Sequence, residues 1–166
     1  DLALRLTKAP PEEAVARPLL QQAPTLRRPR QPAAHGTPQA PQDLPLHRCF
    51  SYLFTDDGHW RLTDREGAEI RVPIHSPLHY NNLECLEDAI LAGQGIGLLP
   101  DFLCAPALAD GRLIRVLPDH EPQVRFGRHL YACYTPSRIR LPKVKVFLAE
   151  LEAALTPVPP WRQGRK

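Results

Sequence analysis

The stretch ILAGQGIGLLP, residues 90–100, contains the pattern Gly-x-Gly-x-Gly between two apolar segments. A dinucleotide-binding loop runs from a strand through a glycine turn into a helix, so that the phosphates meet the helix N-terminus. Here the order is reversed, because residues 83–92 carry apolar side chains at helical spacing and residues 96–99 form a short apolar run before Pro100. The stretch therefore predicts a helix that turns into a buried strand.

The three glycines of this turn have a structural interpretation. Gly93 follows the predicted helix and suits a C-terminal cap, because glycine adopts a positive φ without a Cβ clash. Gly95 and Gly97 predict a tight turn and a close approach of the helix to the sheet. Phosphate binding is the alternative, and the reversed order of helix and strand argues against it.

The composition fits a globular chain of modest size. Its 166 residues suit one ordinary domain or two small lobes, and an apolar fraction of 43% allows a packed core. There is no methionine, so we expect a piece of a larger protein. The net charge of +3 gives no support for a DNA-binding surface. No apolar run reaches the roughly 18 residues that a membrane span needs, and no signal peptide opens the chain.

The cysteines and histidines show no spacing typical of a metal site or of a disulfide framework. Cys49, Cys85, Cys104 and Cys133 are widely separated, and the chain has no Cys-x-x-Cys pair. Reduced thiols in a cytoplasmic protein are the expectation. His47 and Cys49 could form a nucleophile–base pair, but such catalysis also needs a third, orienting group. We therefore predict no catalytic residue, no metal, no cofactor and no enzyme.

Periodicity predicts several short strands and three helices. Strands are expected at residues 1–6, 14–20, 48–54, 60–62, 70–74, 96–99, 112–117 and 129–135. Helices are expected at residues 83–92, at 102–110 with Asp101 as N-cap, and at 141–155 with one apolar face made of Val144, Phe147, Leu148, Leu151 and Leu155. Residues 21–46 contain six prolines and predict no central strand. Alternating strands and helices predict an α/β fold with a mostly parallel sheet.

An ordered set of motifs covers nearly the whole chain: DLALR, AVARPL, HGTPQAPQDLPLHRC, HWRL, NNLECLEDAILAGQGIGLLPDFL, LADGRLIRVLPD, LYACYTP and LPKVKVFLAEL. This set resembles the effector-binding, or substrate-binding, domain of LysR-type transcriptional regulators. The resemblance implies a periplasmic-binding-protein-like (type II) fold, in which two α/β lobes hold a small ligand in a cleft. It also implies a bacterial regulator that binds promoter DNA through a separate helix-turn-helix domain, missing here, and that forms homo-oligomers.

The resemblance implies a division of the chain into lobes. Residues 1–46 are expected to be the remnant of the first lobe, irregular and proline-rich over 24–45, and residues 47–138 the second lobe. Residues 139–156 are expected to return to the first lobe as a helix, and 157–166 to form a flexible tail. The first lobe is expected to be incomplete, because its leading half is missing and residues 25–34 have no strand pattern. We therefore expect the chain to fold mainly through the second lobe and to aggregate.

One predicted set of ligand contacts lies at the end of the first strand. Arg5, Leu6 and Thr7 place a guanidinium and a hydroxyl beyond the carboxyl end of a strand, where ligands of α/β proteins bind. A guanidinium can pair with a carboxylate through two hydrogen bonds. A surface ion pair is the alternative role of Arg5.

The second predicted set leads into the helix at residues 83–92. Tyr80, Asn81 and Asn82 precede its first turn, where unpaired N–H groups favour an anion. N-capping is the alternative for Asn82, which makes Asn81 the preferred contact. By analogy with the family, the effector is expected to be a small carboxylate or aromatic acid. The alternative to effector sensing is a degenerate remnant of the same fold that binds no ligand, or a protein-interaction module.

Overall fold

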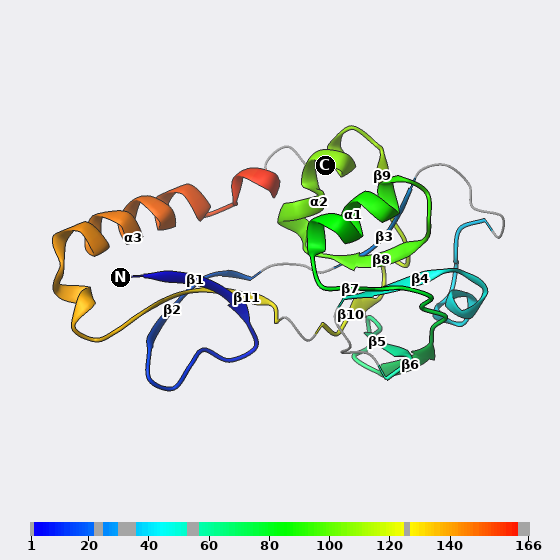
Figure 1. Cartoon of the computed structure of the whole chain (residues 1–166), viewed down its shortest axis with the longest axis horizontal. Helices are drawn as coiled ribbons and strands as arrows, with labels where there is room; N and C mark the ends of the chain where they lie inside the picture. The colour runs from blue at the N-terminus through cyan, green and yellow to red at the C-terminus, as the bar shows by residue number, and fades with distance from the viewer. Residues whose placement is uncertain (1, 22–24, 30–35, 53–56, 125–126, 163–166) are drawn as a thin grey trace. The chain divides into compact units, whose positions relative to one another are not determined.

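The computed structural model describes residues 2–21, 25–29, 36–52, 57–124 and 127–162. It consists of two compact units, of which unit 1 comprises residues 1–23 and 125–166 and unit 2 comprises residues 24–124 (Figure 1). The chain thus leaves unit 1 once and returns to it once. The unit boundaries lie after residues 23 and 124, whereas the predicted lobe boundaries lie after residues 46 and 138.

Unit 1 is a three-stranded antiparallel sheet with a long helix. Its strands lie in the order β1 (Ala3–Thr7), β11 (His129–Tyr134) and β2 (Val15–Gln21). Both outer strands run antiparallel to β11. The helices follow β11 in the order η3 (Arg138–Arg140), α3 (Pro142–Leu155) and η4 (Pro160–Arg162). The predicted strands at 1–6, 14–20 and 129–135 and the helix at 141–155 are therefore confirmed.

The core of unit 1 lies between the sheet and α3. Its buried members are Leu19, Ala132, Tyr134, Val144, Leu148 and Leu155. Trp161 packs against this cluster, and the guanidinium of Arg162 donates a hydrogen bond to the Gln21 carbonyl at 2.7 Å, so part of the predicted tail is in contact with the unit. Residues 163–166 lie outside the described residues.

One prediction for α3 is wrong. Phe147 was expected on the buried face, but its side chain is 49% exposed. The fully buried positions, Val144, Leu148 and Leu155, define a narrow stripe, and Phe147 lies about 100° around the helix from its neighbour Leu148.

Unit 2 contains a mixed five-stranded sheet. Its strands lie in the order β7 (His79–Tyr80), β4 (Cys49–Tyr52), β8 (Ile96–Leu99), β3 (Thr25–Pro29) and β9 (Leu113–Arg115). Only the pairs of β4 with β7 and β8 are parallel, and β3 runs antiparallel to β8 and β9. The predicted absence of a strand at 25–34 is therefore wrong. The sheet departs from the predicted parallel arrangement at β3, which runs opposite to the other four strands.

A second sheet in unit 2 contains the predicted strands at 60–62 and 70–74, which pair as a hairpin. Its order is β10 (Glu121–Pro122), β5 (His59–Thr63) and β6 (Glu69–Pro73), and all pairs are antiparallel. Gly67 closes the hairpin turn with a φ of +87°, and its N–H donates to the Asp64 carbonyl at 3.2 Å. The short helix η1 (Pro41–Leu46) precedes β4.

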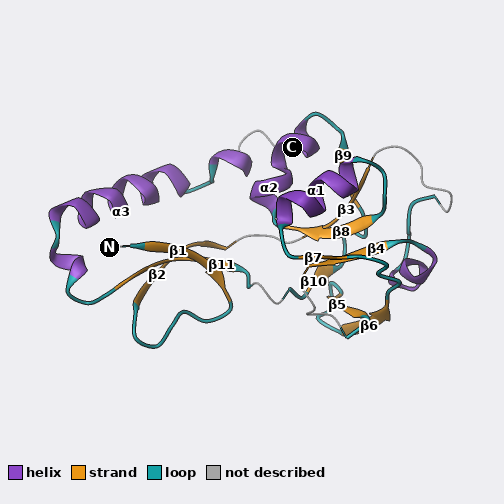
Figure 2. Cartoon of the chain, in the orientation of Figure 1, coloured by secondary structure: helices purple, strands orange, loops and turns teal. Residues whose placement is uncertain are grey.

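Two helices cover one face of the five-stranded sheet (Figure 2). These helices, α1 (Leu83–Leu91) and α2 (Asp101–Ala109), share a core with the sheet that consists of Phe50, Leu86, Ile90, Leu99, Cys104, Ala107 and Leu113. Asp101 is the first residue of α2 rather than its N-cap, which is Pro100 and makes no side-chain capping bond.

The helix-to-strand junction of the opening stretch is present, since α1 ends at Leu91 and β8 begins at Ile96. Gly93 has a φ of +80°, the conformation expected of a residue just past a helix. A Cβ atom on Gly97 would lie 2.5 Å from Ile90 Cδ1, and one on Gly95 would lie 2.4 Å from the Arg48 carbonyl. Gly97 thus allows α1 to pack closely on β8, and Gly95 allows the turn to approach the backbone of Arg48, just before β4.

Candidate functional site

The carboxyl ends of three parallel strands meet at one edge of the five-stranded sheet. In the register of the sheet, Tyr52 of β4 pairs with Tyr80 of β7, and Phe50 pairs with Gly97 of β8. The helix α1 begins three residues after β7, and α2 begins two residues after β8. Two helix N-termini therefore open at the same edge of the sheet. Ligands of α/β proteins bind at such an edge, where backbone N–H groups face outward.

Asn82 is the N-cap of α1. Its side-chain oxygen accepts hydrogen bonds from the Glu84 N–H at 2.7 Å and from the Cys85 N–H at 3.0 Å. These two donors are among those that a helix leaves unpaired in its first turn. The side-chain oxygen of Asn82 is therefore engaged in capping, which is the alternative role given for this residue.

Tyr80 and Asn81 differ in their surroundings. The Tyr80 ring is half-buried and meets the Phe50 ring edge-on, with 5.5 Å between the ring centroids. This contact packs the end of β7 against β4. Asn81 is exposed at the start of the loop that follows β7.

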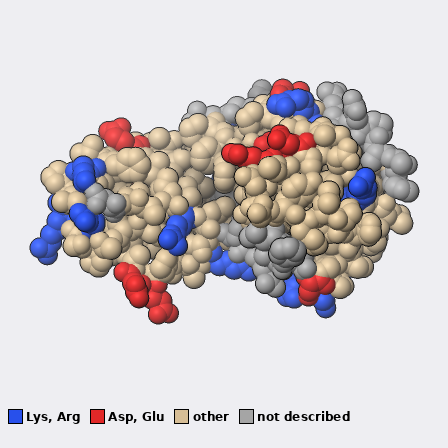
Figure 3. Space-filling model, viewed as in Figure 1, with Lys and Arg blue, Asp and Glu red and all other residues tan. Residues whose placement is uncertain are grey.

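The first turn of each helix carries one carboxylate, Glu84 in α1 and Asp101 in α2. Asp101, which the sequence predicted as an N-cap, is 1% exposed in the first turn of α2, where a negative charge is favourable. Glu84, Glu87 and Asp88 lie on α1, where acidic side chains gather in Figure 3. Burial raises the pKa of the Glu87 carboxyl above its ordinary value, and the charge of Asp88 raises it further.

The set Arg5, Leu6 and Thr7 lies in unit 1, on β1, whereas the set Tyr80, Asn81 and Asn82 lies in unit 2. Thr7 uses its hydroxyl to donate to the Ala9 carbonyl at 2.8 Å. Leu6 is half-buried.

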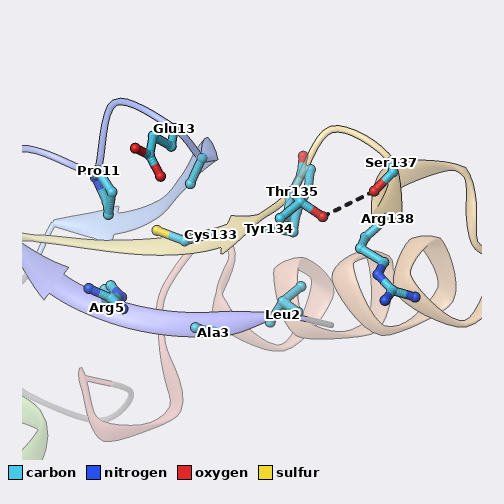
Figure 4. A pocket seen from close by; sticks show the side chains of 11 residues that line it. Leu2, Ala3, Arg5, Pro11, Glu13, Cys133, Tyr134, Thr135, Ser137 and Arg138 are labelled. Carbon is cyan, nitrogen blue, oxygen red and sulfur yellow. Dashed lines mark hydrogen bonds between the residues drawn. The ribbon is translucent and has the colours of Figure 1, made fainter.

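Arg5 lines an open hollow of about 670 Å³ on the surface of unit 1 (Figure 4). The hollow is bounded by β1, by the loop before β2 and by the end of β11. Polar groups in it include Glu13, Arg138 and the hydroxyls of Thr135 and Ser137, which lie 3.2 Å apart. Neither Leu6 nor Thr7 lines it.

The possible nucleophile pair is not activated. Cys49 is buried, and its thiol donates a weak hydrogen bond to the Leu44 carbonyl at 3.6 Å. Burial raises the pKa of this thiol to about 12, so it is protonated at neutral pH. A thiol is a poor nucleophile compared with a thiolate.

Within the described ranges, no group of three or more His, Cys, Asp or Glu side chains could hold a metal ion. The same ranges contain no helix that is long and apolar enough to cross a membrane.

Parallel strands whose carboxyl ends lie next to two helix N-termini are typical of ligand-binding α/β domains. The family model described as LysR substrate binding domain matches residues 1–156. The chain belongs to this family. Its fold is the periplasmic-binding-protein-like fold of LysR regulatory domains, with mixed helix and strand content, as predicted.

The relatives of this chain are transcriptional regulators. A probable HTH-type transcriptional regulator, LtrA of Klebsiella pneumoniae, is 36% identical over 123 residues, which are 73% of this chain and 40% of that protein. CrgA of Neisseria meningitidis, a LysR-type transcriptional regulator of known structure, is 26% identical with a TM-score of 0.79, covering 94% of this chain and 52% of that one. The CrgA regulatory domain alone is 26% identical with a TM-score of 0.74, covering 93% and 75%. The chain thus spans less than half of the length of LtrA.

Proposed function

We propose that this chain senses a small organic effector within a LysR-type transcriptional regulator. The proposal rests on one observation: the carboxyl ends of β4, β7 and β8 lie at the same end of the sheet as the N-termini of α1 and α2. This arrangement directs the positive ends of two helix dipoles toward a ligand at one edge of the sheet. Asn81 adds an exposed amide, and Tyr80 adds an aromatic ring.

The proposed ligand is a small carboxylate or an aromatic acid. Backbone N–H groups bind a carboxylate without requiring a cationic side chain nearby, and a tyrosine ring suits an apolar ligand body. Arg5, Leu6 and Thr7 form a second proposed set of contacts, of which Arg5 offers the charge that pairs best with a carboxylate. We assign no catalytic role to the chain, because its family is one of regulators.

The whole regulator is proposed to convert effector binding into a change at promoter DNA. A ligand shifts an equilibrium only by its difference in affinity for two states, so the effector must favour one state of the regulator over another. DNA contact is assigned to a helix-turn-helix domain outside this chain, in a homo-oligomer. Since promoter DNA of bacteria lies in the cytoplasm, we propose that location for the protein.

Isothermal titration calorimetry of residues 1–166 with benzoate, succinate and glutamate tests the proposal. We expect one of these acids to bind, and Asn81→Ala to weaken binding at least about tenfold, since one lost charge-assisted hydrogen bond is worth roughly 1.5–3 kcal/mol. Gln94→Ala is the matched control, because Gln94 is an exposed amide near the other end of α1.

Asn82→Ala separates capping from ligand contact. Loss of the cap is expected to lower the free energy of unfolding by about 1 kcal/mol, and Asn82→Asp is expected to restore it. If no acid binds to a chain that is folded by circular dichroism, or if Asn81→Ala and Gln94→Ala bind equally well, the proposed sensing loop is wrong and a non-binding domain of the same fold becomes the better interpretation.

A further inference from the structure

The stretch from Glu121 to Glu150 carries acidic residues only at its two ends. Between them lie six Lys or Arg side chains, at positions 125, 128, 138, 140, 143 and 145. The last four belong to η3 and the start of α3, where all four are exposed. In Figure 3, Lys and Arg side chains gather over this end of unit 1. A dense positive charge thus occupies one surface of the unit.

The stability of α3 does not account for these charges. The first turn of a helix favours acidic side chains and disfavours cations, because its N–H groups carry a partial positive charge. α3 has no acidic residue in its first turn, and its N-cap, Leu141, makes no side-chain capping bond. Cations at positions 143 and 145, preceded by those of η3, therefore lower the stability of this end of the helix. Their presence indicates contact with an anionic group.

Two apolar side chains lie among the cations. Ile139, in the middle of η3, is 40% exposed, and Val146 of α3 is 62% exposed. Val146 points away from the core, because the buried residues Val144 and Leu148 lie on the opposite side of the helix. Protein contact surfaces combine apolar groups with a rim of charge in this way. These side chains together form the η3–α3 patch, which consists of Arg138, Ile139, Arg140, Lys143, Lys145 and Val146.

The mixture of charged and apolar groups distinguishes between two classes of anionic partner. A nucleic acid binds Lys and Arg through its phosphates and would leave Ile139 and Val146 in water. An acidic protein segment with interspersed apolar residues matches both kinds of side chain, since its carboxylates pair with the cations and its aliphatic groups cover the apolar ones. The η3–α3 patch therefore fits a protein better than it fits DNA.

We propose that the η3–α3 patch binds a short acidic, amphipathic segment of a partner protein. The carboxylates of the segment pair with the four cations, and its apolar side chains contact Ile139 and Val146. This contact is made by unit 1, whereas the sheet edge at Asn81 belongs to unit 2, so it does not depend on an effector at that edge. Because salt screens exposed charges, the affinity is expected to fall as the salt concentration rises.

Fluorescence anisotropy of a labelled peptide mixed with residues 1–166 tests the chemistry of the partner. The probe is the amidated peptide Glu-Leu-Glu-Glu-Leu-Leu-Glu-Glu-Leu-Glu, with the dye at its N-terminus. One control peptide replaces each Leu by Ser and keeps only the charge, and another replaces each Glu by Gln and keeps only the apolar groups. We expect the probe to bind, and each control peptide to bind at least about tenfold more weakly.

Matched variants of the chain test the location of the contact. Lys145→Glu and Val146→Ser should each weaken binding of the probe at least about fivefold, since one removes a charge pair and the other an apolar contact. Lys8→Glu makes the same charge change at an exposed residue after β1, and Leu46→Ser replaces an apolar side chain that is 65% exposed in unit 2. Both of these control variants should bind the probe as the wild type does, and circular dichroism shows whether each variant is folded.

The stability of Lys145→Glu separates binding from folding. This variant should unfold at the same urea concentration as the wild type or at a higher one, because the start of a helix favours an acidic side chain. The proposal is overturned if the probe does not bind, if the charge-only peptide binds equally well, or if a short DNA duplex displaces the probe at a lower concentration than unlabelled probe does. It is also overturned if residues 1–166 associate with themselves and Lys145→Glu abolishes this association, which would identify a second copy as the partner.

Discussion

Gly97 shows how one residue sets the distance between α1 and β8. The position was predicted from sequence to allow close packing, and an added Cβ would lie 2.5 Å from Ile90 Cδ1 and 3.2 Å from Leu86 Cδ1. Both neighbours are fully buried, so they have little room to move. The glycine is therefore required for its small volume, whereas Gly93, which has open space around it and a φ of +80°, is required for its backbone conformation.

Gly97→Ala is expected to lower the free energy of unfolding by about 1–3 kcal/mol, because it overpacks a dense core. Ile90→Val removes the Cδ1 atom that the new methyl group would meet, at its own cost of about 0.5–1.5 kcal/mol. The double variant should therefore be more stable than the sum of the two single changes predicts. Urea unfolding measures all three variants, and strict additivity would contradict this packing. Gly93→Ala is the control, since Ile90→Val should not rescue it.

Thiol reactivity is expected to follow exposure. Cys85 is exposed, while Cys49, Cys104 and Cys133 are buried, and burial raises the pKa of Cys49 to about 12. One thiol of the native chain should therefore react rapidly with Ellman's reagent at pH 8, and four should react in guanidinium. Cys85→Ser should remove the rapid phase. A rapid phase that survives in Cys85→Ser would show that a buried cysteine becomes accessible.

At the scale of elements, the sequence predicted those helices and turns that depend on neighbouring residues, such as a cap or a turn glycine. The hairpin of β5 and β6 has its turn glycine at Gly67, and α1 has its cap at Asn82, so both could be recognised from short stretches. The strand β3 could not, because Thr-Leu-Arg-Arg-Pro has no alternation and becomes a strand by pairing with β8 and β9. Strand formation depends strongly on such tertiary context.

The short helix η1 should contribute a pH-dependent stabilisation. Asp43 accepts hydrogen bonds from the N–H groups of Gln39 at 2.8 Å and Ala40 at 3.0 Å, and these bonds lower the pKa of its carboxyl below 3.8. A lowered pKa in the folded state gives stability that is present above pH 3.8 and is lost as the pH falls below it. Asp43→Asn should therefore be less stable than the wild type at pH 7 and closer to it near pH 3.

Thermal unfolding between pH 3 and 7 measures this difference. Gln42→Ala, a change at an exposed neighbour in η1, should show no such pH dependence. A constant difference between Asp43→Asn and the wild type over this range would mean that the carboxylate charge has no role in capping.

At the scale of the whole molecule, two hydrophobic clusters of the described residues lie in different units. The cluster around Leu86 lies entirely in unit 2, and the cluster around Leu148 lies entirely in unit 1. The family and its fold could be predicted from the ordered motifs. The unit boundaries could not, because they depend on which strands pair: β3 pairs within unit 2 although the prolines around it suggested an irregular segment.

Truncations in the two cores are expected to act locally. Leu86→Ala and Leu148→Ala should each cost about 2–5 kcal/mol. Amide exchange should accelerate mainly in α1 and β8 for Leu86→Ala and mainly in β2 and β11 for Leu148→Ala. Acceleration of equal size throughout the chain in either variant would show that the two units unfold as one.

The discontinuity of unit 1 has a consequence for synthesis on the ribosome. The central strand β11 is translated about a hundred residues after β2, so β1 and β2 emerge long before the strand that joins them. At translation rates of about 5–20 residues per second, the two strands wait on the order of ten seconds. All of unit 2 emerges during this interval and has the opportunity to fold first. A chaperone that binds nascent chains is therefore expected to bind β1 and β2 before β11 has been synthesised.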